Sequence, residues 1–221
     1  MRLRSKKWAV PFINEHSELI INSQQAEQLK GNWSSRFGNS RPIYLEIGSG
    51  KGQFILDNAL KYPEKNFIGL ELQPTAVAIA GKKAFEQGHQ LTNLKLILGD
   101  GADVDSYFAE NEIGKIFLNH SDPWPKAKHE KRRLTAANFL RSYLTILVPN
   151  GILELKTDNL GLFEYSLSSF KNFGLSWSDN QISYDLHHEL KKNPANIETE
   201  YEKKFAEMNQ PEYWIRINFS F

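Results

Sequence analysis

Short apolar runs alternate with longer amphipathic stretches along this chain. Five runs, dominated by Ile, Leu and Phe, cover residues 42–47, 66–71, 93–98, 115–119 and 151–157. Their apolar positions are nearly continuous, which is typical of strands buried on both faces of a parallel sheet. Residues 213–221 instead alternate apolar with polar side chains, so we expect a half-exposed antiparallel strand there.

Helical patterns fill the intervals between these runs. They cover residues 53–61, 74–87, 103–110, 130–147 and 160–172. In the fourth, apolar residues recur at helical spacing, and Pro149, Asn150 and Gly151 are expected to end the helix before the next strand. Residues 176–200 form a polar stretch. The alternation predicts a doubly wound α/β sheet, whose ligands bind at the carboxyl ends of the strands.

Composition narrows the class of protein. With 221 residues and 40% apolar content, the chain is long enough for one large domain. We expect that domain at residues 41–221, after an N-terminal arm at residues 1–40 that carries a basic cluster. No cysteine is present, which excludes disulfides and thiolate chemistry and fits a reducing compartment. Since no apolar run approaches the length of a membrane span, we expect a cytoplasmic protein.

Cations gather in two places although the net charge is only +1. The first group is Arg2, Arg4, Lys6 and Lys7. The second group follows Asp122, contains one acidic residue, Glu130, and consists of Lys126, Lys128, Lys131, Arg132 and Arg133. A solvated helix face explains many such runs. Because the second group shares a stiff, proline-rich loop with a carboxylate and Trp124, it favours a phosphate-rich ligand.

Candidate chemistry falls directly after the strands, as this fold class requires. Glu46 lies at the end of the first apolar run, and Gly48 and Gly50 open a turn where the backbone can approach a ligand closely. The spacing G-x-G-x-G differs from the G-x-G-x-x-G of pyrophosphate-binding turns. A carboxylate at this place suits a ligand that carries an ammonium or a sulfonium group.

Carboxylates also follow the second and third runs. Glu71 lies about 20 residues past the glycines, where it can bind both ribose hydroxyls, although a solvated strand-end glutamate is the alternative. Asp100 can accept a bond from an adenine amine, or it can cap the helix that follows. Together the three carboxylates outline S-adenosylmethionine, with its amino acid near Gly48 and Gly50.

At this point the chain resembles the bacterial tRNA (guanine-N7)-methyltransferases, over about residues 1–220. Six segments of the chain look like motifs of this family and occur in the same order. They are EIGSGKGQF at 46–54, GLE at 69–71, NHSDPWPK at 119–126, HEKRR at 129–133, KTDN at 156–159 and TEYEKKF at 199–205. The Asp-Pro-Trp-Pro-Lys element is far more specific than the glycine turn. The resemblance implies a Rossmann-like class I methyltransferase fold, a mostly parallel, doubly wound sheet of seven strands with a C-terminal antiparallel strand.

The resemblance also implies an activity and its residues. The reaction would be methyl transfer from S-adenosylmethionine to N7 of guanine 46 in the variable loop of tRNA, without a metal, by a monomer or a homodimer. The cofactor would meet Glu46, Glu71, Asp100 and Asp122, and Asp122 would be the catalytic carboxylate. Guanosine or RNA contacts are expected from Lys126, Lys128, His129, Glu130, Lys131, Arg132, Arg133, Asp158, Thr199, Glu200, Tyr201 and Glu202.

Two departures from the family are visible. His120 stands where the family usually has phenylalanine, and Ala127 with Lys128 replaces a more basic pair. We expect a structural role for His120, with a substrate contact as the alternative. Asp158 could instead be the N-cap of the next helix. Residues 199–205 are expected to close over the target base, or else to form an amphipathic turn that packs Tyr201 and Phe205 into the core.

Other functions stay open on the residues alone. An NAD-dependent oxidoreductase would share the sheet and Glu71, but its glycine spacing differs. A non-catalytic RNA-binding module would not need intact carboxylates after successive strands. A methyltransferase acting on another RNA or on a small molecule fits the cofactor site equally well, and the basic clusters favour RNA. The N-terminal arm could fold over that RNA or pack on the domain.

Overall fold

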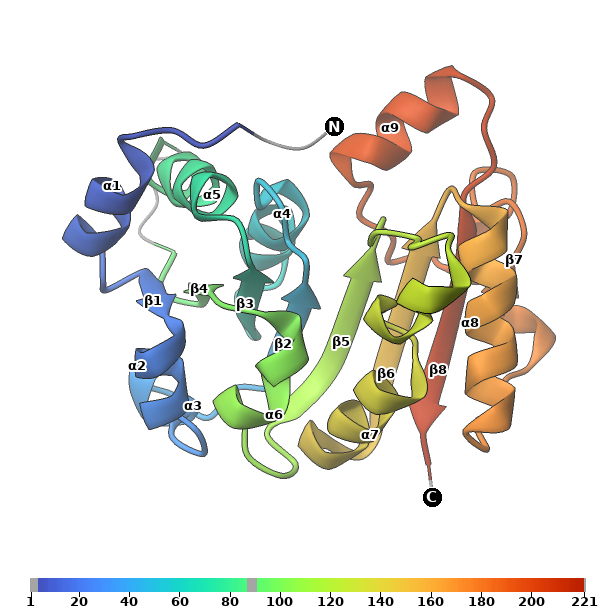
Figure 1. The fold of residues 1–221 in the computed structure, drawn as a ribbon, viewed down its shortest axis with the longest axis horizontal. Coiled ribbons are helices and arrows are strands. Elements are labelled where there is room, and N and C mark those ends of the chain that lie inside the picture. The colour runs from blue at the N-terminus through green and yellow to red at the C-terminus, as the bar shows by residue number, and fades with distance from the viewer. Residues whose placement is uncertain (1–3, 87–90, 221) are drawn as a thin grey trace.

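One sheet of eight strands, in the order β1-β4-β3-β2-β5-β6-β8-β7, organises the molecule (Figure 1). The computed structural model describes residues 4–86 and 91–220. All described strands run parallel except β8, which is antiparallel to both β6 and β7. The strands are β1 (Ile20–Asn22), β2 (Ile43–Ile47), β3 (Asn66–Glu71), β4 (Leu94–Leu98), β5 (Ile113–Asn119), β6 (Leu147–Thr157), β7 (Ile182–Ser183) and β8 (Tyr213–Phe219).

The predicted α/β class with its antiparallel C-terminal strand is confirmed. The sheet has eight strands rather than seven, because short strands extend both edges. β1 comes from the N-terminal segment and pairs with β4, and the two-residue β7 pairs with β8. Neither is long enough to stand out as an apolar run. The last residue of the predicted terminal strand, Phe221, lies outside the described residues.

Helices cover both faces of the sheet and bury two apolar clusters. The helices are α1 (Ala9–Glu15), α2 (Ser23–Gln28), α3 (Trp33–Phe37), α4 (Gln53–Lys61), α5 (Pro74–Glu86), α6 (Val104–Tyr107), α7 (Ala137–Ile146), α8 (Leu160–Asn172) and α9 (Glu200–Glu207). The first cluster receives side chains from α2, α3, α6, α7 and α8, and the second from α1, α4 and α5. This two-sided cover is the doubly wound arrangement that the alternation predicted. None of the helices in the described ranges is long and apolar enough to cross a membrane.

The helix predicted at residues 130–147 is wrong at both ends. Residues 127–132 form a 3-10 turn, and α7 begins only at Ala137. The preceding residues do not continue the helix because Arg133 is extended and turns its guanidinium back toward the loop at Trp124. At the other end, Leu147 already belongs to β6, and Asn150 makes a turn inside that strand at φ 61°. In contrast, α4 and α8 have the predicted bounds.

The described part of the N-terminal segment packs on the sheet and its helices. Trp33 is fully buried, and its indole N–H donates to the carbonyl of Tyr107 at 2.9 Å. Ahead of α1, the backbone N–H of Lys6 donates to Thr75 Oγ1 at 3.0 Å, and Lys82 Nζ lies 3.9 Å from the Trp8 ring centre. Arg2 lies outside the described residues. A boundary at residue 40 stays a prediction.

Candidate active site

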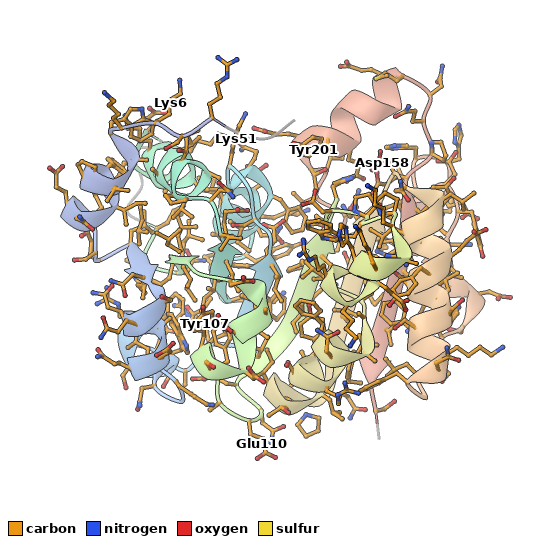
Figure 2. The ribbon with its side chains drawn as sticks, in the orientation of Figure 1. Lys6, Lys51, Tyr107, Glu110, Asp158 and Tyr201 are labelled. Carbon is orange, nitrogen blue, oxygen red and sulfur yellow. The ribbon has the colours of Figure 1, made fainter. Side chains whose placement is uncertain are left out.

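A cleft of about 380 Å³ opens at the carboxyl ends of β2, β3, β4 and β5. Figure 1 shows α9 above the ends of β5 and β6, and Figure 2 shows Lys51, Asp158 and Tyr201 at this end of the molecule, with Glu110 at the other. The predicted site residues that line the cleft are Glu46, Gly48, Gly50, Glu71, Asp100, Asp122, Arg132, Thr199, Glu200 and Tyr201. The fold therefore brings the cofactor motifs and parts of two RNA motifs to one place.

The glycine turn between β2 and α4 depends on backbone angles that other residues rarely adopt. Gly48, Gly50 and Gly52 have φ values of 80°, 55° and 78°. A Cβ atom on Gly52 would also lie 2.5 Å from Ala80 Cβ, so this glycine lets α4 approach α5. The turn exposes backbone atoms to the cleft.

Glu71 is not a solvated strand end. Its Oε2 accepts from the backbone N–H of Gly50 at 2.9 Å, and its Oε1 accepts from that of Gln73 at 2.8 Å. These bonds fix the carboxylate between the glycine turn and the end of β3. Because each carboxylate oxygen has two lone pairs, both can still accept a bond from a ligand hydroxyl.

Glu46 lies on the floor of the cleft and is almost completely buried. Asn119 at the end of β5 donates to its Oε1 at 2.8 Å, whereas its Oε2 has no hydrogen-bond partner among the described residues. Burial raises the pKa of Glu46 to about 8, against the opposing effects of the Asn119 bond and of Lys156. A buried carboxyl with a free oxygen can attract a cationic ligand group and ionise as it binds.

Asp100 caps the turn that follows β4, which is one of the two roles that were considered for it; the adenine contact stays a prediction. Its Oδ1 accepts from the backbone N–H of Ala102 at 2.9 Å and so caps the 3-10 turn after β4. The residue also lines the cleft.

The loop that contains Asp122 is held in shape by the residues around it. Trp124 has a φ of 41°, a strained value for an aromatic residue. Arg133 Nη2 donates to the Trp124 carbonyl at 3.0 Å and Arg133 Nε to that of Pro123 at 3.1 Å. The Arg132 guanidinium lies 4.9 Å from the Trp124 ring centre. Asp122 is exposed and lines the cleft.

The second cationic group therefore divides by environment. Lys126, Lys128 and Lys131 are exposed, as is Glu130. His129 packs edge-on against Trp124, with ring centres 5.5 Å apart. The guanidinium of Arg133 donates to the loop carbonyls and lies 4.1 Å from the Tyr165 ring centre. Arg133 therefore stabilises the conformation of the loop.

Asp158 is not the N-cap of α8. That position belongs to Asn159, whose side chain accepts from the backbone N–H of Leu162 at 2.8 Å. Asp158 instead lies 3.7 Å from His120 Nδ1, and its pKa is lowered, chiefly by interaction with the His120 ring. It is about one third exposed, and Figure 2 shows it at the same end of the molecule as Tyr201. It is not among the residues that line the cleft.

The motif at residues 199–202 combines exposed and buried contacts. Glu200 accepts from Lys83 of α5 at 2.7 Å, and Tyr201 is 58% exposed, so it does not pack into the core. Glu202 is fully buried and pairs with Lys156 Nζ at 2.8 Å. Thr199 Oγ1 accepts from the backbone N–H of Glu202 at 2.9 Å and caps α9. The side chain of Phe205 lies outside the described part of the chain.

Several residues of the site were not predicted. Asn119, the partner of Glu46, belongs to the motif at 119–126 but has no signal of its own. Lys83 and Glu212 contact the site from α5 and from the residue before β8, far away in the sequence. Among the described residues, no group of three or more His, Cys, Asp or Glu side chains is placed to hold a metal ion.

Comparison with known proteins shows the family to which the chain belongs. A family model described as a putative methyltransferase matches residues 40–215. The tRNA (guanine-N(7)-)-methyltransferase of Oenococcus oeni is 84% identical over 99% of this chain and 100% of its own length. The proteins of the same name from Limosilactobacillus reuteri and Leuconostoc mesenteroides are 52% and 50% identical over the same shares.

Solved structures agree on the fold. A structure titled an antibiotic related methyltransferase has a TM-score of 0.62 at 14% identity, covering 86% of this chain and 94% of its own. A 16S rRNA methyltransferase has a TM-score of 0.59 at 13% identity, covering 90% and 94%. At such identities the likeness concerns the fold alone. The sequence relatives go further, and the chain belongs to the tRNA (guanine-N(7)-)-methyltransferase family.

Proposed function

We propose that this protein transfers a methyl group from S-adenosylmethionine to N7 of a guanine in tRNA, at position 46 of the variable loop. The observation that carries the proposal is the cleft itself, which joins Glu46, Glu71 and Asp100 on one side to Asp122 on the other. The names of the relatives supply the acceptor and the atom. Position 46 rests on the family resemblance.

The residues present fit this cofactor. Glu46, with its unpartnered Oε2 and raised pKa, suits the ammonium group of the amino acid. Glu71 retains lone pairs for the ribose hydroxyls, and Asp100 lies beyond it for the adenine. When bound, S-adenosylmethionine supplies an electrophilic methyl group. The four cofactor residues bind and orient it at the carboxyl end of the sheet.

The chain's main task toward guanine is to place and stabilise the base. N7 already carries an exposed lone pair, so no general base is needed to create the nucleophile. Positive charge develops on the purine as N7 is alkylated, and nearby carboxylates stabilise that charge. Asp122 and Asp158 suit this role, since a carboxylate can accept from N1–H and N2–H of guanine. Thr199 and Tyr201 would complete the wall above the base.

The exposed lysines of the second cationic group would hold the phosphates of the tRNA. Lys126, Lys128 and Lys131 are exposed and closely follow Asp122, which lines the cleft, so RNA bound to them would lie near the cleft. A cytoplasmic location follows from such a substrate. A monomer or a homodimer remains our expectation.

The test is methyl transfer from labelled S-adenosylmethionine to two tRNA transcripts, one with guanine and one with adenine at variable-loop position 46. Cleavage specific for N7-methylguanine then locates the product. We expect incorporation into the first transcript alone. Incorporation into both transcripts would contradict position 46. No incorporation into either, with the cofactor still bound, would point instead to another RNA or a small molecule as acceptor.

A further inference from the structure

His120 is held in an unusual backbone conformation at the end of β5. Its φ is 47°, in the left-handed region that few non-glycine residues adopt. Its backbone N–H donates to the carbonyl of Lys156 on β6 at 2.9 Å. The ring is only 6% exposed, yet the residue lines the cleft. The strand pair therefore aims this ring at the cleft wall at a cost in backbone strain.

The ring of His120 joins two segments that our proposed function assigns to the target guanine. Nε2 lies 2.9 Å from Thr199 Oγ1, at the start of α9. Nδ1 lies 3.7 Å from Asp158 Oδ1, just after β6. The ring centre is 5.6 Å from that of Tyr201. A phenylalanine ring could fill the same space but could neither bond Thr199 nor make a polar contact with Asp158.

Behind the ring lies a carboxyl group that the proposed chemistry does not use. Glu212 is fully buried, and its Oε1 is 3.6 Å from His120 Nε2. Neither of its oxygens has a hydrogen-bond partner among the described residues. Burial, and after it the nearby Glu202 carboxylate, raise the pKa of Glu212 to about 9. The neighbouring cation, Lys156, is already paired with Glu202.

Among the described residues, the carboxyl groups of Asp158 and Glu212 both lie within 4 Å of a ring nitrogen, and that of Asp158 is the one whose pKa is lowered. We propose that His120 is a positioning residue, which fixes Asp158 and Thr199 relative to each other so that both can meet the target guanine. This inference rests on the proposed function. It assigns to His120 neither a contact with the cofactor nor a proton transfer to the substrate.

The test measures kcat and KM for tRNA at saturating cofactor in His120→Phe, Asp158→Asn and the double variant. Loss of the bond to Thr199 and of the contact with Asp158 should lower kcat/KM of His120→Phe about tenfold. If His120 acts through Asp158, the same change in the Asp158→Asn background should cost less than about twofold. The dissociation constant for S-adenosylmethionine, measured by calorimetry, should stay within about twofold in His120→Phe.

A second variant guards against a folding defect. Asparagine tolerates positive φ, and its amide reaches about as far as Nδ1, so His120→Asn should keep the Asp158 contact and recover part of the lost kcat/KM. His188→Phe changes an exposed histidine outside the cleft and should leave both kinetic constants unchanged.

In an assay in which the wild-type protein methylates tRNA normally, either of two results would overturn the inference. One is full additivity of His120→Phe and Asp158→Asn, which would mean independent roles. The other is wild-type kcat/KM in His120→Phe. An inactive wild-type protein in the same assay would instead contradict the proposed function.

Discussion

The two sides of the cleft are built differently. On the side that we assign to the cofactor, the cofactor side, backbone atoms set the geometry: glycines at positive φ form the turn, and Glu71 is fixed by two backbone N–H groups. On the substrate side, side chains hold one another. Lys156 pairs with Glu202 inside the protein, and His120 touches Thr199.

This difference separates what the fold provides from what individual residues provide. The cofactor side follows from any sequence that forms these strands and turns, with a carboxylate after each. The substrate side depends on ion pairs and rings contributed by segments that are distant in the chain. We therefore expect substitutions in the buried side-chain pairs of the substrate side to affect stability and RNA recognition together, and those on the cofactor side to affect ligand binding alone.

The largest effect is expected from Lys156→Met. This change leaves the Glu202 carboxylate buried without its cation, and breaking a buried ion pair costs about 3–5 kcal/mol. Urea unfolding would measure the loss. Lys192→Met, which removes the cation of a partly exposed pair with Glu189, is the matched control and should cost at most about 1 kcal/mol. Equal losses in the two variants would contradict the importance of burial.

Asp122→Asn should show the next largest effect, on catalysis rather than on folding. Removing one charge that stabilises the transition state lowers turnover by about 10²–10³-fold. Cofactor binding should be largely kept, because the amide can still accept hydrogen bonds and the other cofactor residues are intact. Single-turnover methylation and calorimetry would separate the two. Unchanged turnover of the purified variant would refute the electrostatic role.

The raised pKa of Glu46 predicts that the affinity for the cofactor depends on pH. Burial raises its pKa to about 8, so without ligand the carboxyl is mostly protonated at pH 7. A cationic ligand favours the ionised form, so binding at pH 7 should release a proton. The dissociation constant should rise by up to about tenfold for each pH unit below 8. Calorimetry in two buffers of different ionisation enthalpy measures the release.

Glu46→Gln is the variant that checks this assignment. It keeps the shape of the side chain and the bond from Asn119 but cannot ionise. Binding should be weaker, independent of pH in this range and without proton release. Proton release that persists in the variant would assign the titration to another group.

The sequence predicted the cofactor side far better than the substrate side, for a physical reason. Glu46, Glu71 and Asp100 lie at or just after the carboxyl ends of apolar runs, and parallel strands bring these ends to the same edge of the sheet. The substrate-side pairs leave no such local pattern, since Lys83 and Glu200 lie 117 positions apart.

Periodicity also misled where tertiary contacts decide the backbone. Leu134 fits the helical stripe of residues 130–147, yet it lies before α7 and lines the cleft.

The run of cations also gave no indication of what each side chain does. Arg133 was expected at the phosphates because it belongs to that run, but its guanidinium donates to the loop carbonyls. A count of charges could not distinguish an arginine that shapes a loop from a lysine that faces solvent.

That distinction can be measured with Lys128→Ala and Arg133→Lys. Lys128 is exposed, so its loss should weaken tRNA binding severalfold and reduce the slope of log affinity against log salt by about 1. Arg133→Lys keeps the charge but loses the forked bonds to the loop, so turnover should fall with little change in slope. Binding assays across a salt series would test both. A slope unchanged in Lys128→Ala would remove this residue from the RNA surface.

The smallest effect is expected where the two sides of the cleft meet, at the pair formed by Lys83 of α5 and Glu200 of α9. The atoms are 2.7 Å apart, but Glu200 is half exposed, so solvent screens the attraction. Lys83→Gln should raise KM for tRNA by up to about fivefold at low salt and less at high salt. The exchange Lys83→Glu with Glu200→Lys should recover most of the loss if the attraction between α5 and α9 is what matters. Failure of the exchange, with both single variants impaired, would mean that Glu200 contacts the substrate directly and that the cofactor and substrate sides are joined only through the sheet beneath them.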